Sequence, residues 1–212
     1  MKTQLRNVPL LGLTLLILTG CIVPPGSAFT PENAAANFAA QTMSVNATVL
    51  SDTLQVRQKI ERTPKTVVVM VSFDRLIDGR RETCLMTQET RRGPLGLWSA
   101  GSGGAGCAGQ PAGQDQFVPL QPLDVGGGQN GGPNPADPGF SYVNGLVYQD
   151  DITLVRVTWE DGQQQIVEVI NQSYIALRAG QFSWQSVEGL NDAEEVIFST
   201  VTGFDPAKPI EP

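Results

Sequence analysis

The hydrophobic pattern changes several times along the chain, and each change predicts a different kind of segment. An apolar run from Val8 to Leu18 comes first. An alanine-rich run to about Met43 predicts one helix, because Thr30-Pro31 supplies a hydroxyl cap and a proline in the first turn. From Val45 to Trp98 apolar and polar residues alternate, as is typical of half-buried strands.

The clearest pair of strands surrounds Asp78-Gly79, a dipeptide that favours a two-residue hairpin turn. That turn would pair Ile77 with Arg80, Arg75 with Glu82, Phe73 with Cys84, Val71 with Met86 and Val69 with Gln88. Alternation then places six apolar side chains on the face that we expect against the helix, with Val68, Met70 and Ser72 on the other face. The six are Val67, Val69, Val71, Phe73, Cys84 and Met86.

Between residues 101 and 139 the composition shifts to glycine, proline, glutamine and asparagine, which predicts a linker that forms no core. A second set of short strands follows, with another hairpin signal at Asp161-Gly162. We expect these strands over 152–159, 165–170 and 174–177, around Phe182 and Trp184, and over 196–201. About sixty residues of short strands suggest a small sandwich-like module.

Together these patterns predict an α+β fold. An N-terminal helix would pack on an antiparallel β-meander, and a Gly/Pro-rich linker and a small all-β, sandwich-like module would follow. The expected division is a signal peptide over 1–20, a lipidated tether over 21–29, an α+β domain over 30–100, the linker over 101–139, a small β domain over 140–204 and a tail over 205–212.

The N-terminus carries a processing signal. Lys2 and Arg6 precede the apolar run, which at about ten residues is shorter than the roughly 20 that a spanning helix needs. The run ends in Leu18-Thr19-Gly20-Cys21, and residues 1–21 therefore resemble the lipobox signal of bacterial lipoproteins. The resemblance implies cleavage before Cys21, acylation of its thiol and a mature chain on the outer side of a membrane. An ordinary secretory signal or an anchor helix is the alternative.

The residue after the cysteine bears on location. Ile22 stands where an Asp would resemble a retention signal for the inner membrane of some Gram-negative bacteria. We therefore expect a membrane-anchored, extracytoplasmic protein, either at the outer membrane or on the outer surface of the cytoplasmic membrane.

Cys84 and Cys107 are the other two cysteines, and an oxidising exterior favours a disulfide between them. Such a bond would stabilise the fold by about 3 kcal/mol, because it restricts the unfolded chain. Two free thiols acting as a redox or metal pair are the alternative, but the pair lacks a C-x-x-C spacing and the chain has no His.

Charge and composition exclude several classes of function. The absence of His removes Ser-His-Asp and Cys-His nucleophiles and metal sites that need imidazole. The chain has 14 Lys and Arg against 21 Asp and Glu, a net charge of −7, and loss of Lys2 and Arg6 with the signal makes it −9. Such a chain repels nucleic acid and gains little from direct electrostatic docking on membranes. Arginine pairs at 80–81 and 91–92 indicate either a solvated strand edge or an anion site.

Two groups of side chains remain as candidates for function. The adjacent acids at 150–151, 160–161 and 194–195 lie at expected turns or strand ends, where solvated carboxylates are normal. Aromatics of the second unit could instead form a surface contact for protein or glycan, with core packing as the alternative. They are Tyr142, Tyr148, Trp159, Tyr174, Phe182 and Trp184.

We therefore expect a lipid-anchored envelope protein that acts as a non-catalytic binding or accessory module. Its expected partners are the membrane, through the lipid on Cys21, and an envelope protein or glycan; no other cofactor, no metal and no catalytic residue is indicated. A His-free hydrolase that uses carboxylates and a structural spacer are the alternatives. A hydrolase would need two carboxylates that converge in a pocket.

Overall fold

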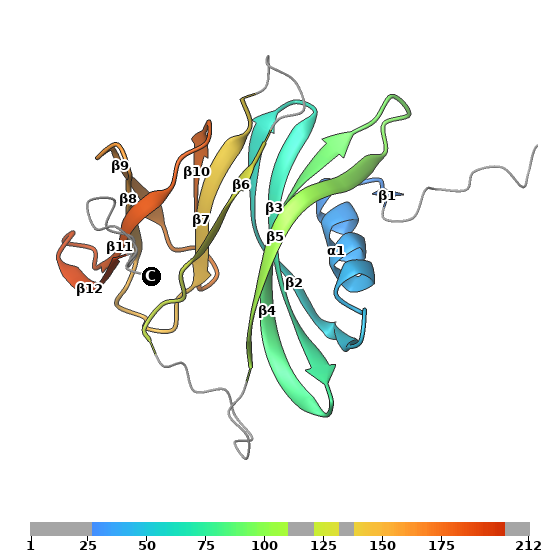
Figure 1. The fold of residues 1–212 in the computed structure, drawn as a ribbon, viewed down its shortest axis with the longest axis horizontal. Helices are drawn as coiled ribbons and strands as arrows, with labels where there is room; N and C mark the ends of the chain where they lie inside the picture. The colour runs from blue at the N-terminus through green and yellow to red at the C-terminus, as the bar shows by residue number, and fades with distance from the viewer. Residues whose placement is uncertain (1–26, 110–120, 132–137, 202–212) are drawn as a thin grey trace, which may run out of the picture.

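The computed structural model describes residues 27–109, 121–131 and 138–201 (Figure 1). The expected signal peptide, Cys21, most of the tether, parts of the linker and the C-terminal tail lie outside the described residues. Within those residues the chain forms one helix, α1 (Pro31–Thr42), and twelve strands. The strands are β1 (Ser27–Ala28), β2 (Thr48–Thr63), β3 (Thr66–Ile77), β4 (Arg80–Arg92), β5 (Trp98–Gly109), β6 (Gly126–Asn130), β7 (Phe140–Leu146), β8 (Leu154–Trp159), β9 (Gln164–Glu168), β10 (Ser173–Ala179), β11 (Trp184–Leu190) and β12 (Val196–Val201).

The expected α+β class is wrong, because the described residues are mostly strand and their single helix has 12 residues. The strands form antiparallel sheets of order β1-β5-β4-β3-β2, β10-β7-β6 and β12-β11-β8-β9, which we call the first, second and third sheets. In Figure 1 the three sheets stack as successive layers, and α1 lies outside the first sheet. No described helix has the length and apolarity needed to cross a membrane.

The central hairpin of the first sheet has the predicted register. Strand β3 pairs with β4 so that Ile77 faces Arg80 and Phe73 faces Cys84. Asp78 and Gly79 both have positive φ, 49° and 75°, as a two-residue turn that matches the strand twist requires. The predicted charge pair also forms, since Arg75 Nη2 lies 2.8 Å from a carboxylate oxygen of Glu82.

The two faces of this hairpin are used as predicted. Thr30 caps α1, and its Oγ1 accepts a hydrogen bond from the Asn33 N–H at 3.2 Å. Ala35 and Ala39 pack on the predicted set of six apolar side chains. On the opposite face, Val68 and Met70 pack against the second sheet. The first sheet is therefore covered on both sides.

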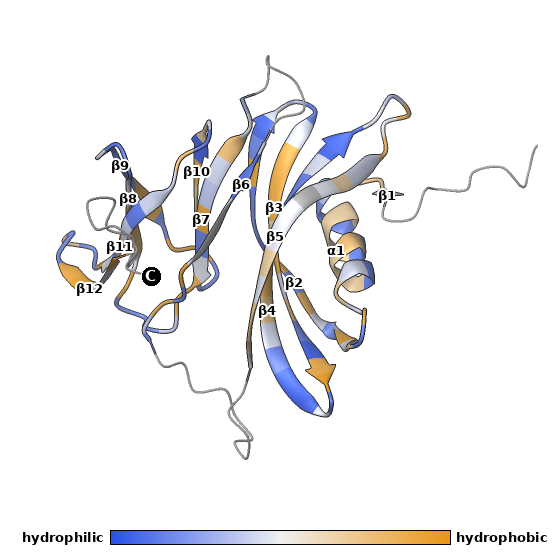
Figure 2. Ribbon diagram, in the orientation of Figure 1, coloured by the Kyte–Doolittle hydropathy of each residue, from blue (hydrophilic) through white to orange (hydrophobic). Residues whose placement is uncertain are grey.

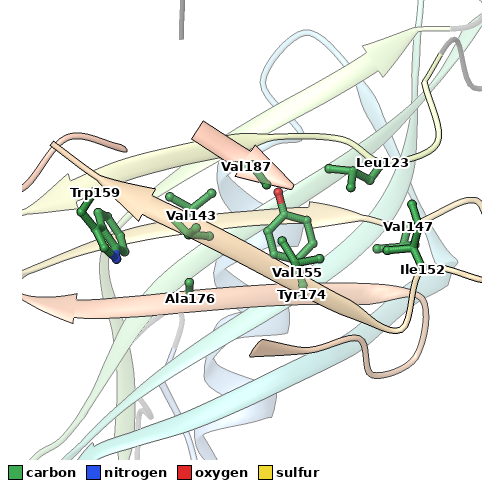
Figure 3. Close-up of a cluster of buried hydrophobic side chains, with 10 residues drawn as sticks. Leu123, Val143, Val147, Ile152, Val155, Trp159, Tyr174, Ala176 and Val187 are labelled. Carbon is green, nitrogen blue, oxygen red and sulfur yellow. The ribbon is translucent and has the colours of Figure 1, made fainter. Parts of the chain in front are cut away.

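The second sheet lies between the other two, and all seven residues of β7 are buried. One face of it packs on the first sheet, through Phe140, Tyr142 and Ile175. The other face packs on the third sheet, and Figure 3 shows the side chains that meet there. They include Val143, Tyr174 and Ala176 from the second sheet and Val155, Val157, Trp159 and Val187 from the third.

The strands expected after residue 140 are present but are divided between two sheets. β8 and β9 form the predicted hairpin around Asp161-Gly162, and Gly162 has φ +82°. β10 pairs with β7 rather than with β9, whereas β11 and β12 extend the third sheet. The predicted small sandwich-like module is therefore wrong, because these strands belong to two different sheets.

Part of the glycine-rich segment is strand rather than linker. Residues 101–109 continue β5, and Gly126–Asn130 form β6 at the edge of the second sheet. Glycine is required there because backbones approach closely: a Cβ on Gly127 would lie 2.8 Å from the Tyr142 carbonyl oxygen. The linker interpretation is wrong for these residues, while the division into two domains stays a prediction.

Candidate functional site

The predicted disulfide is present. Cys84 of β4 and Cys107 of β5 face each other across neighbouring strands and are bonded, with their Cα atoms 4.0 Å apart. Glu82 lies close enough to make the three residues a conceivable metal cluster. Both thiols are consumed by the disulfide, however, so no thiolate is left to bind an ion. The bond is structural.

The aromatics proposed as a surface contact lie mostly inside the molecule. Tyr142, Trp159 and Tyr174 are buried, and Tyr148 and Trp184 are half-buried. The surface interpretation is therefore wrong for the first three. Tyr142 fills the space between the first and second sheets, and Trp159 and Tyr174 fill the space between the second and third. A three-layer stack needs large side chains in both interfaces, which is why these aromatics pack as core.

A cavity of about 440 Å³ opens between the first and second sheets. Its wall on the first sheet is the inner face of β4 and β5, with Thr83, Leu85, Gly106 and Ala108. Its other walls are the segment from Gln121 to Gly127 and the β7 residues 142 and 144–146. Much of this lining is glycine or alanine, so backbone is accessible along the cavity.

Tyr142 is part of the cavity lining. Its hydroxyl lies against Gly104 of β5 and Gly128 of β6, and a Cβ on Gly128 would come within 2.7 Å of it. Burial raises the pKa of this hydroxyl, and a hydrogen bond with the Gly104 backbone offsets part of the increase. Tyr142 therefore stays protonated and acts as a fixed polar wall. Gly106, two residues along β5, is different, because a Cβ there would meet no atom within 4 Å.

Asn144 and Asp124 supply the other polar groups of the cavity. Asn144 is buried, and its Nδ2 donates to Thr87 Oγ1 of the first sheet at 2.6 Å. Asp124 accepts a hydrogen bond from the Tyr148 hydroxyl on its carboxylate, and its carbonyl oxygen accepts one from the Tyr174 hydroxyl at 2.9 Å. Two of the predicted aromatics, Tyr148 and Tyr174, thus hold the Asp124 segment in place.

The electrostatics of Asp124 follow from its position. Burial raises the pKa of its carboxyl group, and the hydrogen bond from Tyr148 offsets part of that increase. Burial and the neighbouring carboxylate both raise the pKa of the Tyr148 hydroxyl, which therefore stays protonated as a donor. The pair is a stable donor–acceptor contact at the cavity wall.

The cavity does not hold the paired carboxylates that a hydrolase of this kind needs. Among the described residues that line it, Asp124 is the one acid. The adjacent acids at 150–151, 160–161 and 194–195 are not part of the lining. Asp161 instead pairs with Arg178, whose guanidinium donates to both carboxylate oxygens, and this pairing lowers the pKa of Asp161 to about 2.

Sequence reasoning did not identify the residues that form this cavity. The signal was present in the glycines, since Gly103-Gly104 and Gly126-Gly127-Gly128 mark strands that another backbone or a neighbouring side chain approaches closely. Composition alone led to the linker interpretation. Comparisons with protein-family models, with curated proteins and with solved structures find no match for this chain.

Proposed function

We propose that the protein is a lipid-anchored protein of the bacterial cell envelope and that it acts on the outer side of a membrane as a binding module. The anchor is proposed from the sequence of residues 1–21, which ends in Leu18-Thr19-Gly20-Cys21. The disulfide between Cys84 and Cys107 supports an oxidising compartment. The net charge of −9 after processing argues against a nucleic-acid partner.

The observation that carries the binding proposal is the cavity between the first and second sheets. Its walls combine small residues, glycine and alanine, with a few apolar side chains and the uncharged polar groups of Thr83, Tyr142 and Asn144, and Asp124 adds one carboxyl group of raised pKa. Accessible backbone N–H and C=O groups suit a polar, uncharged, extended ligand, because such a ligand can exchange hydrogen bonds with them. An envelope peptide or a glycan strand has this chemistry.

The anchor is tested by metabolic labelling with a fatty-acid analogue in cells that express the wild type or Cys21→Ala, followed by membrane fractionation. We expect label and membrane association in the wild type and neither in the variant. Label in both proteins would contradict acylation of Cys21, and label in neither would make this a freely secreted or differently anchored protein.

The cavity is tested with a matched pair of glycine substitutions. A Cβ on Gly106 meets no protein atom within 4 Å, so Gly106→Leu introduces a side chain at the cavity wall, whereas Gly131→Leu adds the same side chain at an open position that is not part of the cavity lining. The probes are soluble peptidoglycan fragments and a set of unstructured ten-residue peptides, assayed separately by titration. We expect binding of one probe class to fall by about tenfold or more in Gly106→Leu and to stay unchanged in Gly131→Leu.

Equal loss in both variants would mean that the substitutions disturb the fold, whereas three other outcomes would contradict the proposal. Binding unaffected by Gly106→Leu would place the site elsewhere on the molecule. Absence of binding to either probe class would favour the spacer alternative, and turnover of a probe that Asp124→Asn abolishes would favour the hydrolase.

A further inference from the structure

We propose that the end of the first sheet that carries the β4–β5 turn docks on the surface of an anionic lipid bilayer. We call this end the membrane-facing tip; it comprises Phe29, Lys65 and residues 91–97. The inference rests on the proposed anchor at Cys21 and adds an orientation: the tip faces the lipid, and the cavity stands clear of the headgroups on the inner side of the sheet.

The tip exposes the two most accessible large apolar side chains in the described part of the chain. Leu95 in the β4–β5 turn is 88% exposed and Phe29 is 81% exposed. Phe29 follows Ala28, which pairs with Trp98 at the start of β5, so both side chains lie at the same end of the sheet. Exposed apolar groups that gather at one end of a domain mark an interaction site.

The turn that carries Leu95 is well ordered by its own hydrogen bonds. The Gly93 N–H donates to the Leu97 carbonyl at 2.8 Å, and the Gly96 N–H donates to the Gly93 carbonyl at 3.0 Å. Gly96 has φ +79°, which lets the turn close. The apolar side chain is therefore held out in solvent by a fixed backbone, with no covering group among the described residues.

Basic residues surround these apolar groups. The Arg92 N–H donates to the Lys65 carbonyl at 2.8 Å, which joins the β2–β3 and β4–β5 turns at this end of the sheet. Lys65 and Arg92 are both exposed. In Figure 2 the end of β4 is hydrophilic next to the apolar turn. The chain as a whole is acidic, but the charge at this end is basic, and a basic and apolar tip is suited to an anionic surface.

The nearby acids do not cancel this local charge. Glu89 is buried and is paired with Arg62 at 2.7 Å and with Arg91 at 2.7 Å. Among the described residues the other acids near this end of the sheet are Glu61, which is exposed on β2, and Glu32, which pairs with Lys59 at 2.6 Å. Around the tip the five basic residues 59, 62, 65, 91 and 92 therefore exceed the three acids 32, 61 and 89, and this end of the sheet keeps a net positive charge in the described part of the chain.

The length of the tether determines which end of the domain is close to the lipid. Five residues separate Cys21 from Ser27, which makes six steps of at most about 3.5 Å each along an extended chain, so Ser27 lies within roughly 20 Å of the acylated cysteine. β1 begins at Ser27 and pairs with the start of β5, beside the β4–β5 turn. An anchored chain must therefore keep the tip near the bilayer.

The test uses the full lipidated chain in vesicles of phosphatidylethanolamine and phosphatidylglycerol. A fluorophore is attached through Leu95→Cys at the tip or through Ser51→Cys on β2, an exposed position toward the opposite end of the sheet. With Cys21 acylated and Cys84 bonded to Cys107, the introduced thiol is the one that reacts. Vesicle flotation measures anchoring, and emission wavelength with acrylamide quenching measures immersion of the label.

We expect the chain to float with the vesicles and the label at position 95 to shift to the blue, with about threefold weaker quenching than at position 51. Lys65→Gln with Arg92→Gln, or Phe29→Ser, should bring the quenching at position 95 toward that at 51. Val45→Ser is the matched control for Phe29→Ser, because Val45 is also exposed but follows the other end of α1.

The outcomes separate docking from anchoring. A chain that floats while both labels are quenched equally would overturn the docking proposal and leave the anchor in place. A chain that does not float would overturn the anchor, and the docking proposal with it. Protection at position 95 that persists in phosphatidylcholine vesicles and in the Lys65→Gln/Arg92→Gln variant would overturn the electrostatic part of the proposal.

Discussion

At the scale of single residues, two glycines of one strand have opposite roles at the cavity. A side chain on Gly104 would overlap the Tyr142 hydroxyl, whereas one on Gly106 would meet nothing within 4 Å. Gly104 is therefore required by packing, whereas Gly106 borders open space in the cavity. Both positions are glycine, so composition does not distinguish them, but in the structure a substitution has a different effect at each.

The contact between Gly104 and Tyr142 predicts a compensating pair of substitutions. Gly104→Ala should lower the free energy of unfolding by about 1–3 kcal/mol, because the added methyl group displaces the tyrosine hydroxyl. Tyr142→Phe should restore the free energy of unfolding that Gly104→Ala loses. Without the hydroxyl, the nearest ring carbon lies 3.6 Å from the added Cβ, which is an ordinary contact. Denaturant unfolding of the two single variants and the double variant measures this coupling. Gly106→Ala is the neutral control, and purely additive effects would contradict the contact.

Asp124 predicts a pH dependence of stability. The pKa of its carboxyl group is higher in the folded protein than in the unfolded chain, so the folded protein binds the carboxyl proton more tightly. Ionisation of Asp124 therefore lowers the free energy of unfolding as the pH rises through the pKa of the folded state. Asp124→Asn should therefore stabilise the protein at pH 7, by less than about 1 kcal/mol because the group is only partly buried. The gain should shrink as pH falls through the folded pKa toward the unfolded one. Thermal unfolding from pH 3 to pH 7 measures it.

Asp161 provides the control of opposite sign for that experiment. The Arg178 guanidinium lowers the pKa of Asp161 to about 2, so its contribution is present above the unfolded pKa and is lost as pH falls toward 2. Asp161→Asn should therefore destabilise the protein at pH 7 and have no effect at the acid limit. Curves of the same sign for the two variants would contradict the environments assigned to both carboxyl groups.

At the scale of elements, short-range signals were sufficient wherever local chemistry decides the structure. The Asp78-Gly79 turn fixed the β3–β4 register, and alternation then fixed which side chains face α1. Thr30-Pro31 fixed the start of α1 for the same reason. In each case one dipeptide restricts the backbone enough to determine its neighbours.

Long-range packing could not be predicted in this way. β10 follows β9 in sequence and yet pairs with β7, and nothing local to Tyr174–Leu177 distinguishes the two partners. Several glycines of β5 and β6 lie close to another backbone or to the Tyr142 side chain, which composition does not reveal. The candidate site lies between these strands, so it was missed together with them.

The disulfide is the element-scale feature whose contribution can be measured directly. Cys84 and Cys107 are 23 residues apart in sequence, so their bond closes a loop that contains the β4–β5 turn. Replacing both by Ala should lower the free energy of unfolding by about 3 kcal/mol, because the unfolded chain regains the freedom of that loop. Reduced wild type should match the double variant in denaturant unfolding. A loss below about 1 kcal/mol would show that the bond does not restrict the unfolded state as proposed.

At the scale of the whole molecule, the second sheet determines how the parts are coupled. Its middle strand β7 is buried on both sides, by the first sheet and by the third. Polar contacts reinforce the first of these interfaces: Gln58 Nε2 donates to the Ser173 carbonyl at 2.6 Å, and the Arg62 guanidinium lies 4.5 Å from the centre of the Phe140 ring. A sheet buried on both faces loses core contacts if either neighbour unfolds.

We therefore predict that the layers unfold in one cooperative transition, with equal calorimetric and van't Hoff enthalpies. Ile175→Ala, at the interface of the first and second sheets, and Val187→Ala, at that of the second and third, should each shift the entire transition, the first by about 2–5 kcal/mol. Ile166→Ala is the exposed control and should shift it little. Two unfolding transitions, each shifted by only one of the core variants, would instead support two separately folding domains. In that case the contacts of β7 would be too weak to couple the first sheet to the third.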